Sequence, residues 1–346
     1  MKKIILFTLL FTMISCGGQE DDVISSTEES SSSSTEESSS SSTEESSSSS
    51  TEESSSSSTE ESSSSSTEES SDTTSTTTTT TIQESSSQTS TIGLTEDSYF
   101  DPFTKYIEVQ NLRIFITPEV SDKFAMQVSE IYELMLGNNN LIDDSLRNGY
   151  FETLSNKYVF QRVGYSGPDY YEEKTGKNFD EALNPHPFNG PYRDNSTDYI
   201  WETPTANTDE KIGEVVEHLL HTVTNVALSY TYPEWNWMNS NSEIYRATME
   251  AIDNNIFDVS DYQRILDRGD DEGYYSIITQ EFMFWVIVVE WGIAEIYELP
   301  SNEFNASTPA EIESKLPIAH GLYKEFIEKI FTPPSIDDLR TILGSN

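Results

Sequence analysis

The hydrophobic and polar positions divide the chain into three stretches. An apolar run occupies Ile4–Ile14, and a stretch with almost no aliphatic or aromatic residues extends from there to about Leu94. From residue 95 to Asn346, apolar and polar positions recur with the periods of strands and helices. Only this last stretch can bury enough hydrophobic surface to fold, so we expect one acidic globular unit, of one or two lobes, over residues 95–346.

The N-terminal part of this unit is expected to form a small sheet. β-Branched residues are frequent over residues 106–117, with a turn signal at Gln110-Asn111 between two strand-like halves. Two further short runs, 157–163 and Tyr199–Glu202, have the composition of strands.

Helices are expected between and after these strands. Helical spacing begins at Ser121, a good N-terminal capping residue, and continues to Leu136, where Gly137 ends it. A Pro-, Gly- and Asn-rich stretch over residues 167–197 is predicted to be a long loop. The pattern therefore predicts an α+β fold, with a small sheet and helices in the N-terminal part and mainly α-helices in the C-terminal part.

The most informative helix is predicted over residues 209–230. Four polar residues share one of its faces within an arc of about 100°, and the opposite side is apolar. These residues are Glu214, Glu217, His218 and His221, and the chain has only four histidines. Imidazole nitrogens and carboxylate oxygens are ligands that zinc accepts. The face therefore indicates a metal site, to which another helix would contribute a further carboxylate.

A second, strongly apolar helix is predicted over residues 279–295. Glu281 and Glu295 lie about 40° apart on it, whereas Glu290 points about 180° away from Glu281. Glu290 and Glu281 therefore cannot serve one site. The apolar centre of this helix is too short to span a membrane, so we expect the helix to be buried in the core.

The order strand, helix, strand, strand and His/Glu helix resembles the N-terminal half of zincin-class zinc metallopeptidases, over residues 106–230. In that class the short strand before the active helix aligns the substrate, and Tyr199–Glu202 would take that place. The class motif is His-Glu-x-x-His, whereas Glu217-His218-Leu-Leu-His221 has its histidines three residues apart. The segment Glu214-Val-Val-Glu217-His218 resembles the inverted motif His-x-x-Glu-His, with Glu214 in place of the first histidine.

The resemblance implies a site and a reaction. His218 and His221 would hold a zinc ion together with a third ligand from a downstream helix, for which Glu281 is preferred. Glu214 would be an alternative ligand or would orient a histidine. The ion would lower the pKa of a water molecule, and Glu217 would take the proton as this water attacks a carbonyl. The implied partners are a divalent metal ion and a peptide or protein substrate.

Two other interpretations fit the same residues. An amphipathic surface helix would show this face without a metal, since each Glu–His pair at i,i+4 adds roughly a few tenths of a kcal/mol when the histidine is charged. Alternatively, the unit would be a non-catalytic adhesive or ligand-binding domain, and the aromatic residues at 230–237 would suit a carbohydrate-stacking surface. Aromatic residues directly after a helix more often belong to the core, which is the expectation here.

The apolar run at the N-terminus has the features of a secretory signal. Lys2 and Lys3 precede it, and about eleven apolar residues suit a signal segment but are too few to cross a bilayer. The segment Met13-Ile14-Ser15-Cys16 resembles a bacterial lipobox, and Cys16 is the only cysteine. We therefore expect a cleaved signal peptide over residues 1–15 and a lipidated Cys16 that anchors the chain to a membrane.

Residues 16–94 are expected to be a disordered stalk. The unit Thr-Glu-Glu-Ser-Ser-Ser-Ser-Ser recurs from Ser25 to about Ser71, and a Thr-rich tail follows. About 80 flexible residues span on the order of 50 Å, which would hold the domain clear of the membrane. The acidic run Glu20–Asp22 resembles the export tag of Bacteroidetes-type lipoproteins, so the expected location is the outer membrane, with the domain exposed at the cell surface.

The charge of the chain limits its partners. The chain has 61 Asp and Glu against 19 Lys and Arg, for a formal net charge of −42. Residues 20–84 hold 17 of the acidic residues and no basic residue, which leaves 44 acidic and 17 basic residues once Lys2 and Lys3 are set aside. Such a field repels phosphate groups, so we do not expect nucleic-acid binding. Metal cations and basic peptides are better partners.

Overall fold

The computed structural model of this chain describes residues 93–96, 102–176 and 197–345. The predicted signal segment, Cys16 and the repeat stretch lie outside these residues, as does most of the predicted loop at 167–197. The described part has an α+β fold, as predicted, with a five-stranded sheet and a mainly helical C-terminal part. None of its helices combines the length and apolar character that crossing a membrane would require.

The sheet has the strand order β1-β2-β3-β4-β5. Pairing is antiparallel from β1 to β3 and parallel from β3 to β5. Gln110 and Asn111 form the predicted turn between β2 and β3, with φ values of 45° and 71°. The predicted strand pair at 106–117 is therefore confirmed. The strands are β1 (Thr95–Glu96), β2 (Lys105–Val109), β3 (Leu112–Ile116), β4 (Phe160–Tyr165) and β5 (Tyr199–Glu202).

The first helix confirms the prediction, and the second was not predicted. Helix α1 (Asp122–Met135) begins at Ser121, whose hydroxyl accepts a hydrogen bond from the Phe124 backbone N–H. Helix α2 (Asp144–Asn156) ends at Lys157, so β4 begins at Phe160 rather than at the predicted residue 157. The start predicted for this strand is wrong because Lys157 is the C-terminal capping residue of α2.

The predicted helix at 209–230 is a single helical segment with a change of hydrogen-bond pattern inside it. It consists of α4 (Thr208–His221), the π-helical η2 (Thr222–Leu228) and α5 (Ser229–Thr231). Asn207 and Glu210 form a reciprocal capping box at its start, which satisfies two backbone N–H groups. The predicted His/Glu face lies wholly on the regular part, α4.

Helix α8 (Asp271–Glu290) is longer at its start and shorter at its end than the predicted helix at 279–295. Gly292 has a φ of 72°, a left-handed conformation that ends the helix, and Glu295 lies in the separate turn η5 (Ala294–Tyr297). The prediction that Glu281 and Glu295 share a helix is therefore wrong. The expected burial is confirmed, because the side chains from Phe282 to Val289 are buried apart from Trp285.

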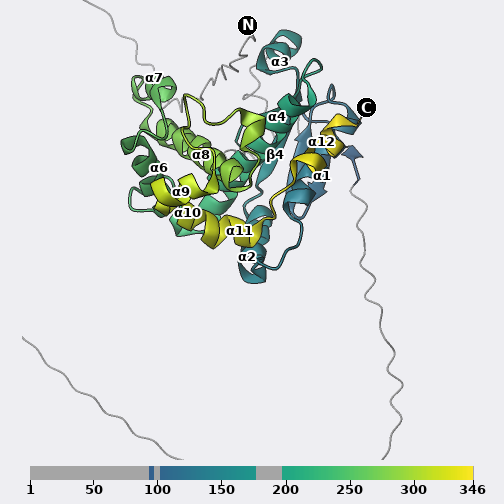
Figure 1. The fold of residues 1–346 in the computed structure, drawn as a ribbon. Helices are drawn as coiled ribbons and strands as arrows, with labels where there is room; N and C mark the ends of the chain where they lie inside the picture. Colours follow the sequence, from purple (N-terminus) through teal and green to yellow (C-terminus); the bar gives the residue numbers. More distant parts are fainter. Residues whose placement is uncertain (1–92, 97–101, 177–196, 346) are drawn as a thin grey trace, which may run out of the picture. The chain divides into compact units, whose positions relative to one another are not determined.

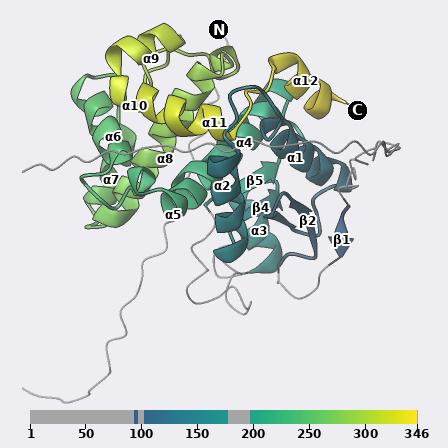
Figure 2. The same cartoon turned by 90° about the horizontal axis from the view of Figure 1, so that it is seen from below.

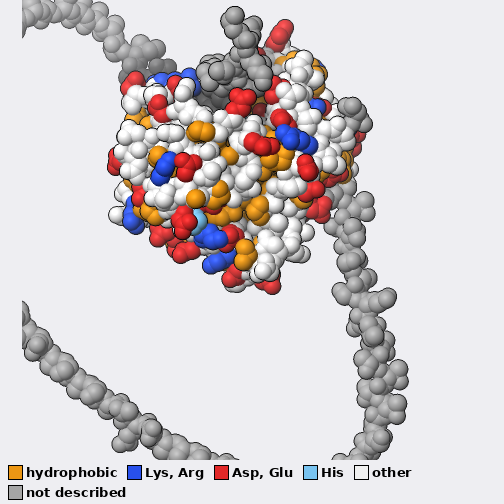
Figure 3. Space-filling view, in the orientation of Figure 1, with side chains coloured by type: hydrophobic (Ala, Val, Ile, Leu, Met, Phe, Trp, Pro, Cys, Tyr) orange, Lys and Arg blue, Asp and Glu red, His pale blue; other side chains and the backbone are white. Residues whose placement is uncertain are grey.

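The remaining elements are α3 (Pro168–Thr175), η3 (Pro233–Trp235), α6 (Glu243–Asp253), η4 (Ser260–Tyr262), α7 (Gln263–Leu266), α9 (Pro309–Lys315), α10 (Pro317–Leu322), η6 (Tyr323–Ile327), α11 (Glu328–Ile330) and α12 (Ile336–Gly344). In Figures 1 and 2, the sheet with α1 to α3 occupies one side of the domain, helices α6 to α10 occupy the other, and α4 lies between them. Figure 3 shows acidic side chains spread over one face of the domain, with Lys and Arg in separate small groups.

Candidate metal centre

Strand β5 and helix α4 run back along each other and bring the candidate residues together. The four residues of β5 rise about 13 Å, a distance that a returning α-helix covers in roughly nine residues. The backbone N–H of Trp201, near the end of the strand, donates to Glu214 Oε1 at 2.7 Å. Asp198, directly before the strand, lies beside the histidines at the end of α4.

Both histidines of α4 are buried, with His218 2% and His221 0% exposed. The Nδ1 atom of His218 lies 2.7 Å from the backbone oxygen of Glu214, a pure acceptor, so this nitrogen carries its proton and donates. The Nδ1 atom of His221 lies 3.2 Å from Asp198 Oδ2. In a neutral His218 ring, Nε2 is therefore the atom with a free lone pair, which is the arrangement found in metal-binding histidines. His221 has a carboxylate beside each of its ring nitrogens, with Glu281 Oε2 3.5 Å from Nε2. The alternative of an exposed amphipathic face does not fit this burial.

Asp198 connects the two imidazoles. Its Oδ2 atom lies 3.5 Å from His218 Nε2 as well as 3.2 Å from His221 Nδ1. Its other oxygen, Oδ1, is buried and has no hydrogen-bond partner in the described part of the chain. Sequence reasoning missed Asp198, because it lies twenty positions before His218, between the predicted loop at 167–197 and the predicted strand Tyr199–Glu202. The signal that could have found it is its position at the start of the strand along which α4 returns.

Helix α8 contributes the carboxylate that the sequence favoured. Glu281 is 6% exposed, and its Oε2 atom lies 3.5 Å from His221 Nε2. That nitrogen is buried and forms no hydrogen bond with any described residue. A carboxylate oxygen of Glu217 on α4 lies within 4.8 Å of a ring nitrogen of His221 and of the Glu281 carboxylate.

The potential ligand atoms form two sets that share His221. One set is Asp198, His218 and His221, and the other is Glu217, His221 and Glu281. Within each set, one donor atom per residue lies within 4.8 Å of the others. His218 and Glu281, which sequence reasoning assigned to one ion, thus fall in different sets. These buried groups could hold a metal ion.

The charges of the cluster shift its pKa values strongly. Burial lowers the pKa of His218, but the carboxylates of Glu214 and Asp198 outweigh burial and raise this pKa to about 9. Burial likewise opposes the charge on His221, yet Glu281 and Asp198 hold its pKa well above the ordinary value. Without a metal ion, the imidazoles therefore carry protons that an ion would have to displace.

The pKa values of the carboxyl groups in the cluster shift in opposite directions. Burial raises the pKa of Asp198, but the two imidazoles outweigh burial and hold this pKa well below its usual range. Burial raises the pKa of Glu217 to about 8, with a further contribution from Glu281. Burial also raises the pKa of Glu214. The pKa thus falls at Asp198, which contacts both imidazoles, whereas burial is the larger effect at Glu217 and Glu214.

Further side chains pack around the cluster beyond its potential ligands. The Tyr262 hydroxyl donates to Glu303 Oε1 at 2.7 Å, and burial, followed by the charge of Glu281, raises the pKa of Glu303 to about 7. The ring of Phe284 packs edge-on against His221 at 5.7 Å between centroids. The cluster therefore has an apolar wall on one side and a further carboxyl group beyond it. Sequence reasoning missed Glu303 and Tyr262, which come from a loop and a short 3₁₀ turn.

The other predicted residues lie elsewhere. Glu290 faces away from Glu281, as expected, and its Oε1 atom lies 2.7 Å from Nδ1 of His320. Glu295 is exposed and lies 3.9 Å from a guanidinium nitrogen of Arg340. Among the aromatic residues at 230–237, Trp235 is 1% exposed and packs against Phe326, so the expectation of a core role is confirmed for this residue.

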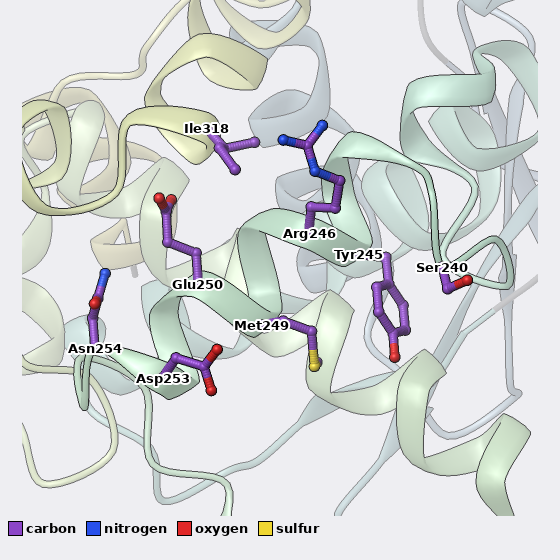
Figure 4. Close-up of a pocket in the computed structure, with 8 residues that line it drawn as sticks. All are labelled: Ser240, Tyr245, Arg246, Met249, Glu250, Asp253, Asn254 and Ile318. Atoms are coloured by element: carbon purple, nitrogen blue, oxygen red, sulfur yellow. The ribbon is translucent and has the colours of Figure 1, made fainter.

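A separate depression of about 430 Å³ lies at helix α6 and shares no residue with the cluster. In Figure 4, Arg246 and Glu250 extend toward Ile318, whereas Tyr245 and Met249 extend from the other side of the helix. One carboxylate oxygen of Glu250 is buried without a hydrogen-bond partner in the described chain. The depression offers both signs of charge but no set of metal ligands.

The fold and the cluster together define an α+β protein with a buried histidine and carboxylate centre. Comparisons with protein-family models, with curated proteins and with solved structures gave no match to this chain. The chemistry of the centre therefore has to be inferred from its own geometry.

Proposed function

We propose that this domain is a zinc-dependent hydrolase, with a peptide bond as substrate, and that Asp198, His218 and His221 hold the ion. Two imidazoles and one carboxylate form a ligand set that zinc uses in hydrolytic enzymes, and a fourth position remains for water. This assignment keeps the two histidines chosen from the sequence and replaces Glu281 with Asp198 as the carboxylate ligand.

The observation that carries the proposal is the position of the buried Asp198 carboxylate between the two imidazoles. Its Oδ2 atom lies 3.5 Å from His218 Nε2 and 3.2 Å from His221 Nδ1, and its Oδ1 atom lacks a hydrogen bond within the described chain. A buried polar atom without a partner costs roughly 1–3 kcal/mol. An ion at the cluster would engage the Asp198 carboxylate and fix both rings, so the residues present fit a metal.

The surrounding residues have roles that follow from their contacts. The Glu214 backbone oxygen accepts from His218 Nδ1 and fixes the orientation of that ring. Glu281 lies on the side of His221 opposite to Asp198, 3.5 Å from the second ring nitrogen. Zinc bound by Asp198, His218 and His221 would lower the pKa of a water molecule. Glu217, the remaining carboxyl group on the same face of α4, would accept the proton from that water.

The proposal includes the membrane anchor predicted at Cys16. Lipidation of Cys16, the acidic repeat stretch and the acidic domain suit a lipoprotein that displays its domain outside the outer membrane. Incorporation of radiolabelled palmitate into the wild-type chain, and its loss in Cys16→Ser, would test the anchor independently of the metal centre.

Elemental analysis of the purified full chain tests the metal centre. We expect bound zinc in the wild type and none in a His218→Ala, His221→Ala double variant, while His320→Ala, which removes a histidine outside the cluster, keeps its zinc. Peptide hydrolysis by the zinc-loaded wild type, lost in Glu217→Gln, would then establish the reaction. A wild-type chain that binds no zinc after dialysis against it would refute the proposal and favour a non-catalytic displayed domain.

A further inference from the structure

We infer that the cluster binds two divalent cations, with His221 as a bridge between them. This inference rests on the proposed function, which places the first ion at Asp198, His218 and His221. The second ion would be held by Glu217, Glu281 and the other ring nitrogen of His221. It would be a carboxylate-rich site beside the zinc site.

The geometry of His221 supports two ions because its two ring nitrogens face different ligand sets. Nδ1 lies 3.2 Å from Asp198 Oδ2, whereas Nε2 lies 3.5 Å from Glu281 Oε2. The two nitrogens of an imidazole point outward in widely different directions, so one ion cannot engage both. Each ligand set is complete by itself, with three donors within 4.8 Å of one another.

The second set is more than a group of acidic side chains. His221 is 0% exposed, and its Nε2 atom has no hydrogen-bond partner among the described residues. This nitrogen points at the Glu281 carboxylate from a distance longer than an ordinary hydrogen bond. An ion between them would satisfy both groups at once.

The charge balance points the same way. Four carboxyl groups lie around the two imidazoles and a fifth lies beyond Glu281, and in the described chain none of the five forms an ion pair with Lys or Arg. If all are ionised and the imidazoles are neutral, one divalent ion leaves three negative charges, whereas two ions bridged by His221 as imidazolate leave two. The five are Asp198, Glu214, Glu217, Glu281 and Glu303. Protonation of carboxyl groups is the other way to relieve this charge, and metal stoichiometry separates the two.

Binding of both ions has a defined proton balance. A neutral imidazole carries one N–H proton, and an imidazole that binds a metal through each nitrogen has none. The second ion therefore binds with release of the His221 ring proton to solvent, and the ring bridges as imidazolate. Glu217 has two carboxylate oxygens, so it can bind the second ion through one and accept a proton through the other.

Equilibrium dialysis of the full chain against zinc, followed by elemental analysis, tests the inference. We expect two ions per chain in the wild type and in His320→Ala. We expect one ion in His218→Ala, which alters only the first set, and one in Glu281→Gln, which alters only the second. Glu290→Gln, a change of the same kind on the same helix, should retain two. Circular dichroism verifies that each variant is folded.

The outcomes distinguish this inference from the proposed function. One ion in the wild type that is lost in His218→Ala and kept in Glu281→Gln would overturn the second site and leave the proposed function standing. No ion in the wild type would overturn both. Copper loading gives a readout that needs no variant: two Cu²⁺ ions joined by imidazolate give a magnetically coupled resonance spectrum, whereas a spectrum of isolated Cu²⁺ would overturn the bridge.

Discussion

Helix α8 carries two glutamates that each lie beside a histidine, and the two pairs differ in burial and in their other partners. Glu290 lies 2.7 Å from His320, whose side chain is 25% exposed, and the two form a simple pair at the edge of the domain. Glu281 lies 3.5 Å from His221, whose side chain is 0% exposed and which also faces Asp198. In the first pair the carboxylate and the imidazole are hydrogen-bonded to each other. The second pair, together with Asp198, leaves buried polar atoms without hydrogen-bond partners in the described chain.

This difference separates a structural ion pair from a candidate metal centre. Buried polar groups in folded proteins normally find partners, so a group of exceptions at one place calls for an explanation. At His320 the explanation is complete without a ligand. At His221 a bound cation supplies the missing partner, and the following predictions compare the two pairs directly.

Zinc should stabilise the folded chain through the His221 cluster alone. At a free zinc concentration of 1,000 times the dissociation constant, the free energy of unfolding should rise by about 4 kcal/mol, because the ion binds the folded state. Urea unfolding with zinc and with a chelator measures this difference. His221→Ala should abolish the response and His320→Ala should retain it. An equal loss in both variants would show that the two histidines do not differ as argued.

The stability of the zinc-free chain and the additional stability that zinc provides should change with pH in opposite directions. His218 has a pKa of about 9 in the fold, above its ordinary value, so its charge stabilises the zinc-free fold at low pH and this contribution is lost as pH rises through 9. Glu217, with a pKa raised to about 8, is held neutral in the fold, and its ionisation costs stability as pH rises toward 8. The zinc-free chain should therefore become less stable from pH 5 to pH 9.

Asp198 does not alter this trend. Its pKa lies well below the usual range, so its contribution is lost only in acid, below the window considered. Zinc binding requires deprotonated ligands, so the stabilisation by zinc should grow over the same window. Urea midpoints at pH 5, 7 and 9, with and without zinc, measure both slopes. Parallel slopes would argue against a metal at this cluster.

Glu217→Gln should stabilise the zinc-free chain at pH 9. Burial and the neighbouring Glu281 disfavour the charge of Glu217, and glutamine keeps the shape of the side chain without that charge. The expected gain in the free energy of unfolding is about 1–2 kcal/mol. The same variant should lose hydrolysis when zinc is present. Destabilisation at pH 9 would contradict the prediction, because it would mean that a partner in the zinc-free fold stabilises the negative charge of Glu217.

The sequence predicted the local part of the cluster and Glu281 on a downstream helix, but it missed Asp198, Glu303 and Tyr262. Glu214, Glu217, His218 and His221 share a face because a helix repeats every 3.6 residues, which is visible in any short window. Asp198 could not be chosen in this way, because it reaches the histidines only through the return of α4 along β5. Glu303 lies beside Glu281 through packing between segments more than twenty residues apart, for which no local pattern exists.

The errors in the fold have the same origin. The apolar pattern of α8 continues past its true end, so it could not show that Gly292 breaks the helix and removes Glu295 from the face of Glu281. Helix α2 has a weak apolar stripe, and its capping Asp143 was the signal that could have located it. A strong hydrophobic period thus predicted that a helix or strand is present, whereas single residues at its ends determine where it begins and stops.

Glu290→Gln should produce the smallest effect and defines the baseline of the comparison. The glutamine oxygen can still accept from His320 Nδ1, and His320 is partly exposed, so only the charge of the pair is lost. The free energy of unfolding should fall by about 1 kcal/mol or less. Zinc binding and its pH dependence should match the wild type. A loss of zinc from Glu290→Gln comparable to that from Glu281→Gln would show that both substitutions act through α8 as a whole, and the distinction between the two pairs would then fail.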